Sequence, residues 1–346
     1  MTEKSNSKLK KRPTSFDVAR VASVSRSSVS LVFNNVGGNR VSTDTRERIL
    51  KAAHDLGYQP DHAASALRKG YSNEIAFVAA ESISATVSAQ GLASAQERAF
   101  QLGYSFGIYL FYNLPENERH KFFTSMVTRR PVGIFGPTHL ITRQDSILAK
   151  KMGIQAVVLQ GFDPVEYAPT QLFPLKEAFY LAAKHLVERG HKHIAHVVPR
   201  TPNPLEESTN VIILDGLHSA VKESNGTITE LPMDLDIADA DTVVDILLSS
   251  PAHPTAIVGN RDEYCFFLLK ALSARKIRIP RDMALVGINN NPFCVLSNPA
   301  LTSVSFDIQT TLSHAVDAID AIAQGKKINP EWLLFPPPHL VVRESS

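Results

Sequence analysis

The chain has 346 residues, a length that allows two or three domains with hydrophobic cores of their own. Hydrophobic residues make up 44% and charged residues 20%, which is the composition of an ordinary globular protein. No long apolar run occurs, and no apolar stretch follows the basic N-terminus, so neither a membrane span nor a secretory signal is predicted. The two cysteines, Cys265 and Cys294, lack metal-ligand spacing, so a reducing cytoplasm is the expected location.

The net charge of +2 conceals an asymmetry along the chain. Residues 1–72 contain 13 Lys and Arg against 6 Asp and Glu, whereas the remainder contains 23 against 28. A basic block joined to an acidic body indicates a nucleic-acid partner for that block. The ordinary alternative is a solvated, disordered tail, which fits residues 1–13 but not the regular pattern that follows them.

Three short helices are predicted after the basic tail. Thr14 and Asp17 match a capping box at the start of the first helix, and Ser25 can cap the second. Ser42 can cap the third helix, which carries an apolar stripe and ends at Gly57. The residues expected to form their shared core are Val18, Val21, Val24, Val29 and Val32. This arrangement predicts a helix-turn-helix unit, although three-helix units also serve as plain interaction modules.

The exposed side of the second predicted helix carries short or basic side chains: Arg26, Ser27, Ser30 and Leu31. Such a surface can lie in the major groove of DNA, where long acidic side chains would be repelled by phosphate. The following segment, 60–72, predicts a short helical stretch with small residues and one exposed leucine, Leu67, and no local partner on which to pack.

Residues 14–72 closely resemble the LacI/GalR repressor family. The matching strings are TSFDVARVASVSRSSVSLVFNN, VSTDTRERILKAAHDLGYQP and ASALRKG, in the family's order and at its spacing apart from a slightly long loop at 36–40. The resemblance implies a DNA-binding domain at 14–59 and a hinge helix at 60–72 that pairs with its dimer mate. In the family this helix pushes a leucine into the minor groove; Leu67 occupies that place, and Arg68 follows it. An apolar wedge of this kind unstacks bases and bends the duplex; an ordinary linker leucine is the alternative.

The DNA contacts implied by this resemblance lie in the headpiece and the hinge helix. Arg26 and Ser27 are the main candidates for base contact, because Leu31 stands where the family often has arginine and offers only apolar contact. Ser25, Ser30 and Asn34 are expected on phosphates. The whole expected set is Thr14, Ser15, Ser25, Arg26, Ser27, Ser30, Leu31, Asn34, Arg40, Ala63, Leu67 and Arg68.

From Glu74 the pattern changes to alternating strands and helices, which predicts an α/β fold. EIAFVAA, YSFGIYL, VGIFG and QAVVLQ predict one set of buried parallel strands, and HIAHVV, TAIVG and ALVGI predict a second. Two sets imply two lobes, each a doubly wound parallel sheet. Strings such as AAKHLVERGHKHIAHV, PTAIV and LTSVSFD resemble the family's periplasmic-binding-protein-like core. The resemblance implies an effector-binding and dimerisation core at 73–346, with an N-lobe at about 73–172 and 307–328 and a C-lobe at about 173–306 and 329–346.

Ligands of open α/β sheets bind beyond the carboxyl ends of the strands. The residues expected to contact an effector on this ground are Glu81, Ser82, Arg261, Asp262 and Asn289, each of which could equally be a solvated loop residue.

The polar set that grips sugar hydroxyls in sugar-binding family members has largely changed. By ungapped counting its places fall on Pro174, Leu175, Ile213, Arg261 and Asn289. A cleft without those donors and acceptors cannot compensate a polyol for its desolvation. The effector is therefore expected to be an acidic or less polar metabolite, with Arg261 available for an anionic group. A modified or oligomeric saccharide, a core that binds no small molecule, and a slipped alignment are the alternatives.

No metal, cofactor or catalytic site is expected. The histidines near residue 190 fall at a turn or on opposite strand faces, and the aspartates between 234 and 241 are spaced too irregularly for a calcium loop. No glycine-rich phosphate loop, GxSxG, HExxH or CxxC motif occurs.

The sequence therefore predicts a ligand-responsive, sequence-specific transcriptional regulator and not an enzyme. Repression follows the family's habit. The expected partners are a pseudo-palindromic double-stranded DNA operator, a small-molecule effector and a second copy of the chain, with a tetramer also compatible and no membrane involved. A periplasmic solute receptor would share the core but would have no use for the headpiece, and an enzyme on this fold would need a phosphate loop or an acid–base pair.

Overall fold

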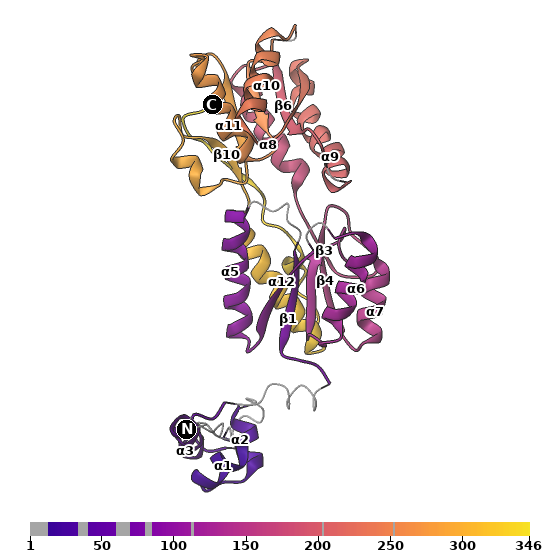
Figure 1. The fold of residues 1–346 in the computed structure, drawn as a ribbon, viewed down its shortest axis with the longest axis vertical. Helices are drawn as coiled ribbons and strands as arrows, with labels where there is room; N and C mark the ends of the chain where they lie inside the picture. The colour runs from indigo at the N-terminus through magenta and orange to yellow at the C-terminus, as the bar shows by residue number, and fades with distance from the viewer. Residues whose placement is uncertain are drawn as a thin grey trace, which may run out of the picture. The chain divides into compact units, whose positions relative to one another are not determined.

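The computed structural model describes residues 13–33, 41–59, 70–79, 85–111, 114–202, 204–251 and 253–346. The chain divides into two compact units, Met1–Ser72 and Asn73–Ser346 (Figure 1). Most of the basic tail and of the expected hinge helix lies outside the described residues. The same holds for seven of the expected site residues: Asn34, Arg40, Ala63, Leu67, Arg68, Glu81 and Ser82.

The first unit contains the three predicted helices, α1 (Ser15–Val21), α2 (Arg26–Phe33) and α3 (Thr43–Leu56). Their ends follow the local signals of the sequence. The hydroxyl of Thr14 donates to the Asp17 carboxylate over 2.7 Å, and the hydroxyl oxygen of Ser42 accepts from the Thr45 amide over 3.3 Å. At the end of α3, Gly57 has a φ of 64°, a left-handed conformation that favours glycine.

The core of the headpiece is small and closes around all three helices. Val18, Val29 and Val32 are buried as expected, and the third helix adds Ile49 with two alanines. Val24 is only partly buried against this cluster, and Val21 is 52% exposed, so the expectation for Val21 was wrong. Val21 is the last residue of α1 and lies outside the shared core.

The N-lobe is a five-stranded parallel sheet in the order β2-β1-β3-β4-β5. Its strands are β1 (Glu74–Ala79), β2 (Ser105–Leu110), β3 (Gly133–Pro137), β4 (Ala156–Gly161) and β5 (Thr170–Leu172). One face packs on α5 (Ala85–Gln101) and α12 (Ile308–Ala323), and the other packs on α6 (Glu116–Val127) and α7 (Arg143–Lys151) (Figure 1). Alternate residues of β1 point to opposite faces, Ile75 and Phe77 to the first and Ala76 and Val78 to the second, as the two-residue period of a strand requires.

The C-lobe is a six-stranded sheet in the order β11-β10-β9-β8-β6-β7, parallel except for β11. Its strands are β6 (His193–Pro199), β7 (Thr227–Met233), β8 (Ala256–Gly259), β9 (Ala284–Ile288), β10 (Thr302–Ser305) and β11 (His339–Val341). Helices α8 (Leu175–Glu188) and α9 (Pro204–Val221) cover one face, and α10 (Ile237–Ser249) and α11 (Asp262–Ala274) cover the other. Among the described residues no helix combines the length and the apolar character needed to span a bilayer.

The chain passes between the lobes after β5, after β10 and before β11. A fully buried side chain, Gln171 in β5, joins all three passages. Its amide nitrogen donates to the carbonyl oxygens of Thr311 over 3.0 Å and Trp332 over 2.7 Å. The ring of Phe173 lies beside those of Phe306 and Phe335, with centroids 4.7 and 4.9 Å away.

Candidate DNA-binding surface and effector pocket

Helix α2 buries one side and exposes the other. Val29 and Val32 are fixed in the headpiece core, so Arg26 and Ser27 are exposed near its N-terminal end. The first turn of α2 contains no acidic residue. The positive end of the helix dipole is therefore not offset by a carboxylate of that turn, which favours an approaching phosphate.

The hydroxyl groups at the start of α2 form a connected set. Ser25 accepts a hydrogen bond from the Ser28 amide over 3.1 Å, and its hydroxyl shares hydrogen bonds of 2.6 and 2.9 Å with those of Ser27 and Ser28. Ser25 and Ser27 are exposed, whereas Ser30 and Leu31 are half-buried. The structure thus brings Arg26 and Ser27, the expected base-contacting residues, to one exposed end of α2.

Thr14 and Ser15 lie at the start of α1, the former exposed and the latter half-buried. The Asp17 carboxylate accepts hydrogen bonds from both the backbone amide and the hydroxyl of Thr14, so the capping box fixes the Thr14 side chain at the start of α1. Arg20 also interacts with Asp17, over 3.3 Å, in an exposed pair of the kind that contributes little to stability.

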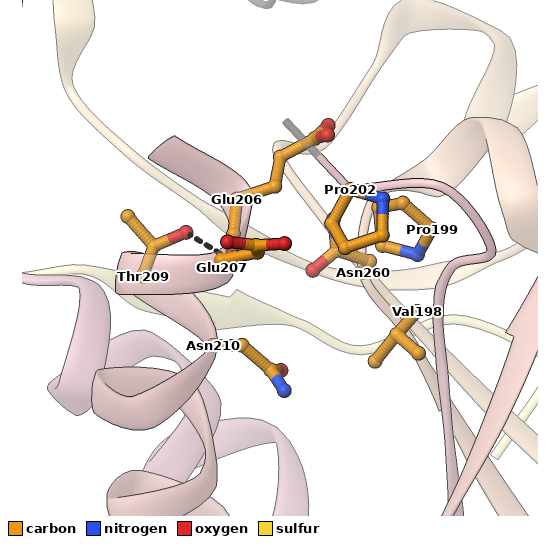
Figure 2. Close-up of a pocket in the computed structure, with 8 residues that line it drawn as sticks. All are labelled: Val198, Pro199, Pro202, Glu206, Glu207, Thr209, Asn210 and Asn260. Carbon is orange, nitrogen blue, oxygen red and sulfur yellow. Dashed lines mark hydrogen bonds between the residues drawn. The ribbon is translucent and has the colours of Figure 1, made fainter. Parts of the chain in front are cut away.

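A cavity of about 210 Å³ opens at the carboxyl edge of the C-lobe sheet (Figure 2). It is formed where β6 and β8 end and α9 begins. Its apolar wall and its polar groups come from these three elements; the lining residues are Val198, Pro199, Pro202, Glu206, Glu207, Thr209, Asn210 and Asn260. The position agrees with the expectation for ligands of open α/β sheets, but the three expected effector residues that the structure describes, Arg261, Asp262 and Asn289, are not among those that line the cavity.

Asp262 lies beside this edge but faces the protein interior. Its side chain is fully buried, with one carboxylate oxygen 2.6 Å from the Ser303 hydroxyl and the other 2.6 Å from the Asn291 amide. Burial raises the pKa of this carboxyl to about 7, while the hydrogen bonds from Asn291 and Ser303 oppose that rise. In this structure the oxygens of Asp262, expected to contact an effector, are occupied by the loop that follows β9 and by β10.

Arg261, expected to be available for an anionic group, already has neighbours on its guanidinium. Its guanidinium lies 4.0 Å from the Glu206 carboxylate and over the ring of Tyr264, 5.6 Å from the centroid. Asn289 follows β9, is half-buried and has a φ of 101°. Its backbone N–H donates to the Val304 carbonyl over 2.8 Å. Of the positions counted from the sugar-binding set, Ile213 is buried in the C-lobe core.

Three histidines of the C-lobe, His191, His193 and His196, hydrogen-bond to residues in or beside the sheet. His196 is fully buried, its Nδ1 lies 3.0 Å from the Val258 carbonyl, and burial lowers its pKa to about 4. His191 and His193 hydrogen-bond to Thr255 and Thr227, over 2.9 and 2.8 Å. No group of three His, Cys, Asp or Glu within the described ranges is arranged to hold a metal ion.

The cavity residues on α9 were not predicted, because the rule for ligands of open α/β sheets points to residues that directly follow strands. Pro199 ends β6, a strand that the sequence did predict, and could have been found by the same rule. Glu206 and Glu207 stand in the first turn of α9, a signal that also fits a helix start whose carboxylates merely offset the dipole.

Comparisons with known proteins match the headpiece and the α/β core to two different family models. Residues 16–61 match the model of the bacterial regulatory proteins of the lacI family, and residues 183–346 match that of the periplasmic binding protein-like domain. The HTH-type transcriptional regulator DegA of Bacillus subtilis (strain 168) is 27% identical over 341 residues, covering 97% of this chain and 98% of DegA. The HTH-type transcriptional repressor PurR of Klebsiella pneumoniae (strain 342) is 27% identical over 295 residues, covering 83% and 84% of the two chains.

Solved structures share the same fold. The lac repressor dimer bound to operator and the anti-inducer ONPF superposes with a TM-score of 0.75 at 23% identity, covering 97% of this chain and 99% of that one. The complex of the transcriptional regulator CelR with cellobiose has a TM-score of 0.66 at 22% identity, covering 97% and 100%. The α/β fold with an N-terminal helix-turn-helix unit is therefore confirmed.

Proposed function

The chain belongs to the LacI family of bacterial regulatory proteins, and from this premise we propose that it represses transcription by binding a pseudo-palindromic operator as a homodimer. The observation that carries the proposal is the exposed end of α2, where Arg26 and Ser27 stand at a helix start free of acidic residues. This end of a helix suits the major groove, with base edges read by side chains and phosphates held at the positive end of the dipole.

The proposed DNA contacts divide by their chemistry. Arg26 and Ser27 read base edges, Leu31 offers apolar contact, and the hydroxyl groups of Ser25 and Ser30 bind phosphates. Thr14, Ser15, Asn34 and Arg40 add backbone contacts, and the hinge at 60–72 supplies Ala63, Leu67 and Arg68 to the minor groove. In this organisation residues 14–59 bind DNA, and residues 73–346 bind the effector and form the dimer.

Exposed apolar side chains of the core support dimerisation. The short helix η3 (Pro292–Val295) and the residue after it leave Phe293, Val295 and Leu296 exposed by 56%, 59% and 74%. A hollow lined by Phe266, Leu269 and other residues of α11 adjoins them. Large apolar side chains that gather on one surface mark interaction sites, and a second copy of this chain is the occupant that a two-fold operator requires. The lac repressor, a relative in fold, is itself a dimer on its operator.

The cavity at the end of β6 is the proposed effector site. Its place at the carboxyl edge of a parallel sheet is where such folds bind small molecules, and CelR is a relative in fold that binds cellobiose. Binding that favours one conformation of the core would alter operator affinity by the difference between the two states. The relatives of this chain are regulators rather than enzymes, and a repressor of chromosomal genes works in the cytoplasm.

Selection from random DNA duplexes tests the proposal. We expect the full chain to enrich an inverted repeat whose half-sites are related by two-fold symmetry. Leu31→Arg, selected in parallel, is expected to gain guanine at one position per half-site, because arginine makes paired hydrogen bonds to that base. Failure to enrich any motif would contradict the proposed function, whereas identical motifs for both proteins would remove only the role of Leu31.

A further inference from the structure

The cavity of the C-lobe is rich in hydrogen-bond acceptors. Glu206 and Glu207 carry carboxylates, which only accept when ionised. The Thr209 hydroxyl donates to the Glu206 carbonyl over 3.2 Å, so its remaining capacity is that of an acceptor. The side-chain nitrogen of Asn210 commits a hydrogen to the Glu230 carboxylate over 2.8 Å. Most of these groups are left to act as acceptors, which favours a ligand that brings donors, and Figure 2 shows these groups of α9 across from Pro199, Pro202 and Asn260.

Charged groups of both signs surround the cavity, and the arginines among them already pair with carboxylates. Arg200, which directly follows β6, binds the carboxylate of Asp239 through two nitrogens, with Nε 3.2 Å and Nη2 2.7 Å from Oδ2, and also lies 3.4 Å from Asp234. Arg261 lies between Glu206 and the ring of Tyr264. Both arginines thus already face carboxylates.

The carboxylates outnumber these arginines. Glu207 has no ion pair with any lysine or arginine of the described residues, and Glu230 adds a further negative charge behind Asn210. An anion entering the cavity would meet unfavourable like charge, whereas a cation would gain charge-assisted hydrogen bonds.

We propose that the effector presents an ammonium group to Glu206 and Glu207, with an apolar part of its skeleton against Val198, Pro199 and Pro202. This inference rests on the proposed effector role of the cavity and replaces the acidic metabolite that the sequence favoured. The reason is that Arg261, the cation on which that expectation depended, is engaged beside Glu206 and does not line the cavity. Ammonium groups carry three donors and no acceptor, which complements the lining.

Two matched sets of probes test the ligand class with the full chain. Each set holds one skeleton and changes one kind of group: D-glucosamine, D-glucose and D-glucuronate, and putrescine, 1,4-butanediol and succinate. Thermal shift is followed up to about 10 mM of each probe, enough to detect millimolar dissociation constants. We expect saturable stabilisation by an amine, with an affinity about tenfold or more above that of its neutral and acidic counterparts.

Two variants test whether the amine probes bind in the cavity. Glu207→Gln, an exposed change that keeps the side-chain shape, is expected to weaken amine binding by about tenfold. Glu188→Gln, at the end of α8 and outside the cavity lining, is the matched control and is expected to leave it unchanged. Preference for a carboxylate, no preference for an amine in either set, or equal effects of the two variants would overturn the inference. Operator affinity measured on the same samples separates the proposed ligand class from the proposed function. Intact operator binding without a preference for amines would reject the ligand class but not the repressor function.

Discussion

The carboxyl group of Asp262 shows how a single residue can hold a strand end in place. Asp262 is the first residue of α11, and its carboxylate accepts hydrogen bonds from the backbone amide of Asn291 and the hydroxyl of Ser303. These bonds connect α11 to β10 and to the loop after β9. This position of the Asp262 carboxylate also requires a glycine at residue 287 in β9, because a Cβ on Gly287 would overlap with Oδ1 of Asp262. A buried carboxyl is costly when ionised, and the hydrogen bonds recover only part of that cost.

The pKa of Asp262 makes stability depend on pH. Burial raises it from an ordinary 3.8 to about 7, so its stabilising contribution is present below about pH 4 and is lost as the pH rises through about 7. We expect Asp262→Asn to weaken this dependence, so that its unfolding free energy falls less between pH 5 and pH 8 than that of the unaltered protein. Urea denaturation at the two pH values measures the difference.

Comparing the two proteins at each pH isolates Asp262 from other titrating groups. His139 and His196 have pKa values lowered to about 4 by burial, and they act in the opposite sense, since their contribution is lost as the pH falls. Both are present in variant and parent. Parallel pH profiles of unfolding would show that Asp262 is not the cause.

At the residue scale the sequence locates strand ends better than it locates binding groups. Arg261 and Asp262 do follow β8 at the carboxyl edge, as expected, yet one lies beside Glu206 and the other faces the interior. Which way such a side chain points depends on partners far away in the chain, such as Ser303, that no local pattern connects to it.

Among the elements, those defined by neighbouring residues were predicted and those defined by distant contacts were not. The capping box of Thr14 and the left-handed Gly57 need only their own turn, and both are found where expected. Strands β5 and β7 were missed. β5 has three residues, and β7 is an edge strand with exposed polar positions, so neither has the apolar run of a buried strand.

The passages between the lobes depend on Gln171, the buried glutamine of β5. We expect Gln171→Leu to destabilise the core by about 1–3 kcal/mol, because it leaves the carbonyl oxygens of Thr311 and Trp332 without their donor. Chemical denaturation measures the change. Gln155→Leu, at an exposed position, is the control and is expected to stay within about 0.5 kcal/mol of the parent. Equal stability of the two variants would mean that the Gln171 hydrogen bonds do not brace the passages.

On the scale of the whole molecule, the division into a basic headpiece and an α/β core was predictable, because charge, helix caps and strand periodicity each change near residue 73. The fold followed from the order of these elements. The cavity did not follow in the same way, because its lining residues come from the end of β6 and the loop after it, the residue after β8 and the start of α9. The headpiece has a small core, and one copy of it can hold only half of a two-fold operator, so the proposed repression requires two chains on one duplex.

The stoichiometry of the complex tests this claim most directly. Sedimentation equilibrium of the full chain with a duplex carrying the selected inverted repeat should give a complex with two chains of 38.0 kDa per duplex. A duplex with one half-site should bind far more weakly, because the second headpiece then loses its specific contacts. A complex with one chain per duplex, or equal affinity for one and two half-sites, would contradict the account.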